Sequence, residues 1–166
     1  MGTYINIGNE GFVSALNSEY VDKSGVIAVI NSTLNTERRF SCVTRCRRFG
    51  KSLAAKTLCA YYDNSCDSRE LFSDLEVAGD PSFEKYLNKY PVIYLDMTNF
   101  VSEKEFGIAE KIDADLLADI SRAYPDTPVE PKDKLANYLL CVSETKKQQF
   151  IFIIDEWDAI CREYES

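Results

Sequence analysis

Apolar positions recur at helical spacing over three stretches of the chain. In each stretch, residues three and four apart would share one face of a helix and pack that face against a core. The stretches are 26–34, 108–120 and 135–142. A further helix is predicted over 53–62, and Asp80–Pro81 has the pattern of a helix start, with a capping side chain followed by proline.

Short continuous apolar runs predict strands over 40–44, 91–96 and 150–154. The run at 91–96 is apolar enough to be buried on both faces of a sheet. Strands that alternate with helices in this way indicate an α/β fold with a parallel sheet. We find no internal repeat, linker or low-complexity tract, so the sequence predicts a single domain over 1–166.

The composition is that of an ordinary globular domain, with 45% hydrophobic and 12% aromatic residues. No apolar run approaches the roughly 20 residues of a membrane helix, and the first residues show neither a basic leader nor an apolar segment. We therefore expect a cytoplasmic protein without membrane contact. Its six cysteines include no C-x-x-C pair and the chain has no histidine, so we expect reduced thiols and no catalysis of the Ser-His or Cys-His type.

Charge is distributed unevenly along the chain. The net charge is −8, which argues against direct binding of nucleic acid through its phosphates. Four basic residues nevertheless fall within the seven positions 45–51, where no acid occurs. A compact cationic segment on an acidic protein points to a small polyanion bound at one place.

The tripeptide Gly50-Lys51-Ser52 lies between a predicted strand and a predicted helix. A phosphate loop belongs at this point, because backbone N–H groups at a helix N-terminus attract phosphate oxygens. In such a loop the lysine meets the β- and γ-phosphates and the serine hydroxyl binds magnesium. The full pattern G-x-x-x-x-G-K-[ST] is not met, since Arg45 stands where the first glycine would be.

A second motif supports phosphate binding. The apolar run 150–154 ends in Asp155-Glu156. In P-loop enzymes an aspartate at this point holds magnesium through water, and the adjacent glutamate polarises the attacking water. A strand and several helices separate this pair from Lys51, as they do in P-loop enzymes, so the two motifs together favour a nucleotide site.

The residues around both motifs resemble the predicted AAA-ATPase-like family. Positions 44–53 read TRCRRFGKSL, where the family has T-R-P-R-R-F-G-K-S in its Walker A loop, and positions 20–24 read YVDKS, where the family has Y-V-D-K-[ST]. Further matches in kind and order are the segments 71–72, 90–95 and 154–159, the last of which carries the Walker B acids. The resemblance spans about residues 12–160 and accounts for Arg45, because the family has arginine there.

The resemblance implies a three-layer α/β/α P-loop NTPase-like parallel sheet. The family's chains continue beyond the acidic motif with a sensor strand, a last strand, often an arginine finger and commonly a nuclease-like domain. We therefore expect 1–166 to be the N-terminal portion of such a domain, truncated after the Walker B strand. The strands 40–44 and 150–154 would then flank an open slot, which could close or accept a second copy or a protein partner by strand addition. Cys46, in place of the family's proline, would loosen the loop without removing a phosphate donor.

The sequence thus predicts a site for ATP and Mg²⁺. The candidate nucleotide-binding residues are Arg45, Arg47, Arg48, Phe49, Gly50, Lys51 and Ser52. Ser52 and Asp155 are the candidate magnesium ligands, and Glu156 is the candidate catalytic residue. Asp22 and Lys23 either face the nucleotide base or form an ion pair at a helix entry.

We expect the chain to bind ATP and, in isolation, to hydrolyse it weakly or not at all, since the family's further segments supply groups that stabilise charge in phosphoryl transfer. The alternative function is non-enzymatic. In it, the acidic protein comes from a phage or mobile element and inhibits a nucleic-acid-binding nuclease, in the manner of an anti-CRISPR protein.

Overall fold

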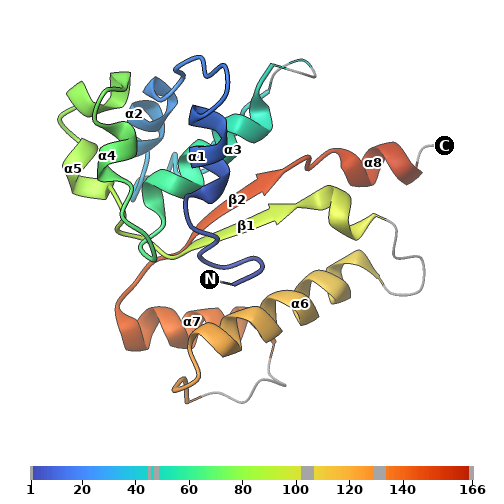
Figure 1. Cartoon of the computed structure of the whole chain (residues 1–166). Helices are drawn as coiled ribbons and strands as arrows, with labels where there is room; N and C mark the ends of the chain where they lie inside the picture. The colour runs from blue at the N-terminus through green and yellow to red at the C-terminus, as the bar shows by residue number, and fades with distance from the viewer. Residues whose placement is uncertain (1, 45, 47–48, 102–106, 129–133, 165–166) are drawn as a thin grey trace. The chain divides into compact units, whose positions relative to one another are not determined.

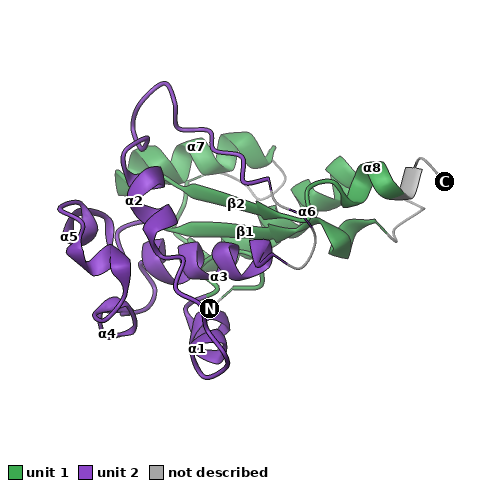
Figure 2. Ribbon diagram, turned by 90° about the horizontal axis from the view of Figure 1, so that it is seen from above, with its two compact units in different colours: residues 1–7, 91–166 green, residues 8–90 purple. Residues whose placement is uncertain are grey.

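The computed structural model describes residues 2–44, 46, 49–101, 107–128 and 134–164. Two compact units account for the chain, one formed by residues 1–7 with 91–166 and the other by residues 8–90 (Figure 2). We call them unit 1 and unit 2. Each has its own core and its own half of the predicted site.

The sheet of unit 1 consists of two parallel strands, β1 (Val92–Asp96) and β2 (Ile151–Asp155). They pair in register from Val92 opposite Ile151 to Asp96 opposite Asp155. The other edge of β1 is occupied by the N-terminal segment, where Ile5 forms an antiparallel bridge with Ile93. β1 is therefore the central strand of unit 1.

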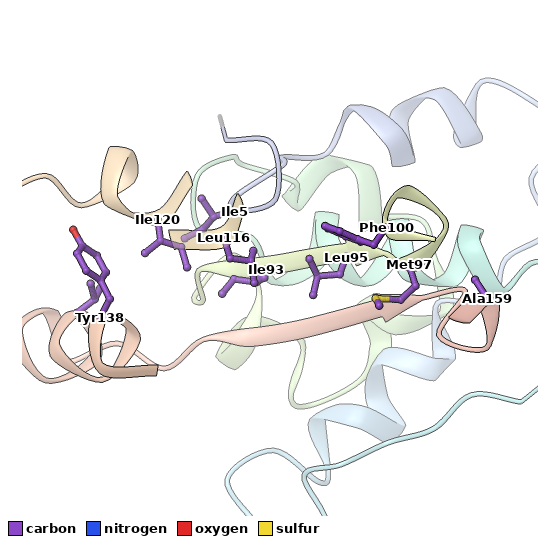
Figure 3. Packing of buried hydrophobic residues seen from close by; sticks show 10 residues of the cluster. Ile5, Ile93, Leu95, Met97, Phe100, Leu116, Ile120, Tyr138 and Ala159 are labelled. Carbon is purple, nitrogen blue, oxygen red and sulfur yellow. The ribbon is translucent and has the colours of Figure 1, made fainter. Parts of the chain in front are cut away.

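Parallel strands require a crossover connection, and helices supply it here. The connection contains η2 (Met97–Phe100), α6 (Ile108–Ala123) and α7 (Leu135–Lys146), and α8 (Ala159–Tyr164) follows β2 (Figure 1). Ile93 and Leu95 of β1 pack with Leu116 and Ile120 of α6 and with Tyr138 of α7 (Figure 3). The apolar faces predicted from the sequence for these two helices are thus the faces that they bury.

Phe152 and Ile154 of β2 lie opposite Ile93 and Leu95 in the register and so share their face of the sheet. Their side chains are nevertheless 49% and 51% exposed. The cover that α6 and α7 give to β1 therefore does not extend over β2.

The first residues of unit 1 are anchored to α6 by one carboxylate. Asp119 is 2% exposed, and its Oδ2 accepts hydrogen bonds from the backbone N–H groups of Tyr4 (2.7 Å) and Ile5 (3.0 Å). Its Oδ1 forms an ion pair with Arg122 at 2.9 Å. Burial disfavours the charged carboxyl, but the N–H donors and Arg122 outweigh this effect, so the pKa of Asp119 is lowered.

Unit 2 is helical. Its elements are α1 (Glu10–Leu16), α2 (Gly25–Asn31), α3 (Lys51–Tyr62), α4 (Arg69–Phe72), η1 (Glu76–Gly79) and α5 (Phe83–Tyr86). Aromatic side chains fill its core: the rings of Phe12 and Phe72 stack at 4.9 Å, and Tyr61 meets Tyr62 edge-on at 4.8 Å. Such pairs stabilise a core beyond their buried area.

Asn31 at the end of α2 satisfies the hydroxyls of this aromatic core. Its side chain donates to the hydroxyl oxygen of Tyr61 (3.1 Å) and to Ser82 Oγ (2.8 Å), and its Oδ1 accepts from the Tyr62 hydroxyl (2.7 Å). Burial raises the pKa of Tyr61 to about 12. Burial also raises the pKa of Tyr62, so both hydroxyls stay neutral at physiological pH, which suits a buried hydrogen-bond network.

Most elements predicted from the sequence are confirmed. The predicted helices correspond to α2, α3, α6 and α7, and two of the predicted strands correspond to β1 and β2. At Asp80–Pro81 a turn precedes the short helix α5, and the Asp80 carboxylate accepts the N–H of Ser82 (2.8 Å). The single domain over 1–166 and the three-layer sheet stay predictions, since the described residues form a two-stranded parallel sheet.

The strand predicted over 40–44 is wrong. These residues have no regular structure, and Phe40 is 84% exposed. A strand is stabilised by backbone hydrogen bonds to a neighbour, and no such ladder partner is present for this segment among the described residues. Its apolar pattern therefore does not produce a strand.

We predict that Asp119→Asn lowers the free energy of unfolding by about 1–2 kcal/mol at pH 7, because the buried side chain loses the charge that its donors stabilise. The lowered pKa gives this contribution a pH dependence. It is fully present above the ordinary aspartate pKa of about 4 and is lost as the pH falls through the lowered value.

Urea unfolding of wild type and variant at pH 7 and at about pH 3 checks this, and the difference in stability should shrink at the lower pH. Asp113→Asn, an exposed position on the same helix, is the matched control and should have little effect at either pH. Equal decreases in the free energy of unfolding of Asp119→Asn and Asp113→Asn would contradict the prediction.

Candidate functional site

The phosphate-loop half of the predicted site lies in unit 2, where α3 begins. Gly50 precedes the helix with φ 79° and ψ 28°, in the left-handed region. This conformation is strained for residues with a Cβ and open to glycine, so the turn depends on Gly50. Lys51 and Ser52 follow as the first two residues of the helix.

The start of α3 suits an anion. The N–H groups in the first turn of a helix point out of its N-terminal end, and the helix dipole places partial positive charge there. Here the first intrahelical bond runs from the N–H of Ala54 to the carbonyl of Gly50 (2.9 Å). The 12 residues of α3 and the ammonium group of Lys51 add to the positive potential at this end.

The segment Asp22-Lys23-Ser24 does not form the ion pair that was one of its two sequence-based interpretations. Asp22 instead accepts the backbone N–H groups of Ser24 (2.8 Å) and Glu76 (2.7 Å). Desolvation acts against these donors, but they prevail and lower the pKa of Asp22. Lys23 Nζ donates to the carbonyl oxygen of Phe49, in the phosphate loop, at 3.3 Å.

The acidic half of the predicted site lies in unit 1, at the carboxyl end of its sheet. Asp155 ends β2 directly opposite Asp96, which ends β1. The Asp155 side chain is buried, and its Oδ2 accepts from the Tyr94 hydroxyl at 3.3 Å. Its Oδ1 accepts the N–H of Glu156 at 2.9 Å. Ligands of parallel α/β sheets bind at this end of the strands.

Glu156 has two distinctive features. Its φ of 49° lies in the left-handed region, which is uncommon for a residue with a side chain and is concentrated at functional sites. Its Oε2 accepts a hydrogen bond from Arg162 Nη2 at 2.8 Å, and Arg162 also lies 3.7 Å from Asp158. The candidate catalytic carboxylate is thus already paired with a guanidinium.

The structure does not bear on every predicted site residue. Arg45, Arg47 and Arg48 lie outside the described residues. Phe49, Gly50, Lys51 and Ser52 are contiguous in unit 2, whereas Asp155 and Glu156 belong to unit 1. Sequence reasoning missed the Lys23–Phe49 and Glu156–Arg162 contacts. They join residues 26 and 6 positions apart, and neither separation is the helical spacing of three or four that a sequence pattern reveals.

The residue types present suit magnesium. Among the described residues, no group of three or more acids or cysteines is placed to hold a metal ion. Magnesium does not need such a group, because it usually takes one or two protein oxygens together with phosphate oxygens and waters. The Ser52 hydroxyl and the Asp155 carboxylate are oxygen ligands of this kind.

Of the comparisons with known proteins, the one with family models agrees with the resemblance in the sequence. Neither the curated proteins nor the solved structures give a match to the chain. No helix in the described part of the chain combines the length and apolar character needed to cross a membrane. A family described as Predicted AAA-ATPase matches residues 6–164, which include both halves of the predicted site. The chain therefore belongs to the predicted AAA-ATPase family.

Proposed function

We propose that this chain binds ATP with magnesium at the start of α3. The observation that carries the proposal is the left-handed Gly50 followed by Lys51 and Ser52 at the N-terminus of a 12-residue helix. Membership of a family described as a predicted AAA-ATPase supports it, because the description names a nucleotide-using class. A polyphosphate is the anion that such a loop binds.

Each residue of the site has a proposed role. Lys51 and Arg48 meet the phosphates, with Arg45, Arg47, Phe49 and Gly50 forming the rest of the loop. Ser52 and Asp155 hold magnesium, which neutralises charge on the β- and γ-phosphates when bound. The Tyr94 hydroxyl keeps the Asp155 carboxylate oriented, and Glu156 orients a water.

We propose that hydrolysis by the isolated chain is slow. Glu156 would act through its carboxylate, yet Arg162 already donates to Oε2 of that group. A carboxylate held by a guanidinium has fewer lone pairs left to orient a water. The same bond holds Arg162, the guanidinium that follows the acidic motif in sequence, at Glu156.

A partner at the sheet also stays a proposal. The expected partner, a second copy or another protein, would add a strand beside β2, which among the described residues pairs with β1 alone. The exposed side chains of Phe152 and Ile154 on β2 support this proposal, since they offer apolar surface next to that edge. The acidic inhibitor of a nuclease gains no support from the family match and stays a prediction. It requires a complex that weakens with salt and that survives Lys51→Ala.

Replacing Lys51 with methionine should weaken binding of Mg-ATP at least about tenfold, because the phosphates lose a charge-assisted hydrogen bond. Isothermal titration at fixed ionic strength measures this. Lys56→Met is the matched control, since it removes the same charge from the same helix, and it should leave the affinity unchanged. If titration of the wild-type protein with millimolar Mg-ATP gives no heat of binding, the proposed function is wrong.

Steady-state phosphate release should be on the order of 10⁻³ per second for the wild-type chain, as in P-loop enzymes without an added arginine. Glu156→Gln should abolish it, because an amide cannot act as the base. Arg162→Gln should raise it about fivefold by freeing the Glu156 carboxylate.

The control for the charge change is Arg122→Gln, which alters the same unit away from the acidic motif. Phosphate release by the wild-type chain at about one per second would show that the Glu156–Arg162 pair does not restrain hydrolysis. An unchanged rate in Arg162→Gln would lead to the same conclusion.

A further inference from the structure

We infer that Lys23 is a positioning residue of the phosphate loop, which it holds in the conformation that receives a polyphosphate. The inference takes its ligand, a polyphosphate, from the proposed function. The contacts that support it all lie within unit 2. Lys23 Nζ donates to the Phe49 carbonyl oxygen at 3.3 Å. The same nitrogen lies 3.4 Å from the point that a Cβ on Gly50 would occupy. The ammonium group therefore lies against the peptide that joins Phe49 to Gly50.

That peptide determines how the loop presents its donors. A trans peptide is planar, and its C=O and N–H point in opposite directions. When Lys23 holds the Phe49 carbonyl on one side, the N–H of Gly50 is directed to the other. The bond thus fixes the peptide orientation just before the left-handed Gly50 and the first turn of α3.

The backbone that carries Lys23 is itself fixed on both sides. Asp22 accepts the N–H groups of Ser24 and Glu76, and the fully buried Ser24 accepts the N–H of Val77 at 3.1 Å through its Oγ. Both neighbours of Lys23 are therefore tied to η1. The lysine reaches the loop from an anchored segment, which reduces the entropy lost when it makes the bond.

The charge of Lys23 favours the same ligand. Its ammonium group lies beside Gly50, one residue before Lys51, so its charge adds to that of the first residue of α3. Two cations at a helix N-terminus suit a polyphosphate, whereas a purine ring offers no charge for them. The contact with Phe49 thus favours the phosphate over the base as the moiety that Lys23 serves.

The first test uses the protein without nucleotide. Lys23→Met removes the donor and keeps the aliphatic stem, Lys23→Arg restores a cationic donor, and Lys89→Met removes an equal charge elsewhere in unit 2. Amide hydrogen exchange over 49–53 should be about fivefold faster in Lys23→Met than in wild type, with unchanged thermal midpoints. The exchange rate in Lys23→Arg should be close to the wild-type rate, and the rate in Lys89→Met should equal the wild-type rate. Unchanged exchange in Lys23→Met would overturn the inference.

The second test measures affinity for Mg-ATP and for magnesium tripolyphosphate, which lacks base and sugar. Lys23→Met should weaken both by about tenfold, and Lys23→Arg should recover most of the loss. Weakening of ATP alone would place Lys23 at the nucleoside and overturn the inference, as would an equal effect of Lys89→Met. If wild type binds neither ligand, the proposed function fails, while the exchange rates still decide whether Lys23 holds the loop.

Discussion

β1 is hydrogen-bonded along both edges, to β2 on one side and to the N-terminal segment on the other, and unit 1 is built around this constraint. The parallel pairing requires a crossover, so α6 and α7 lie between the strands in sequence and pack against Ile93 and Leu95 of β1. The same pairing brings Asp96 and Asp155 to one end of the sheet. Asp119 fixes the N-terminal segment, which pairs with the edge of β1 opposite β2.

In unit 2, one helix serves both the core and the phosphate loop. Tyr61 and Tyr62, at the end of α3, are buried in the aromatic core and bonded to Asn31. Lys51 and Ser52 lie at the other end of the same helix. Because the C-terminal end of α3 is fixed by packing, its first turn has a defined direction. Gly50 and the Lys23–Phe49 contact lie directly before that turn.

The regular elements were predictable because periodicity reports which face of a helix is buried. The positions Leu116, Ile120, Tyr138 and Val142 illustrate this, as all four are buried as expected. The segment 40–44 was not predictable, because an apolar run expresses a preference for the extended state but carries no information on a partner strand. The motif residues were located by spacing, whereas the contact of Lys23 with Phe49 joins residues 26 apart and depends on tertiary structure.

Trp157 is the only tryptophan of the chain, and it directly follows Asp155 and Glu156 with its side chain 56% exposed. Indole emission shifts with the polarity of its surroundings, and under excitation selective for tryptophan the emission comes from this one position. The acidic motif thus carries its own optical reporter. Changes in solvation at the end of β2 can be followed in the unlabelled protein, without signal from any other tryptophan.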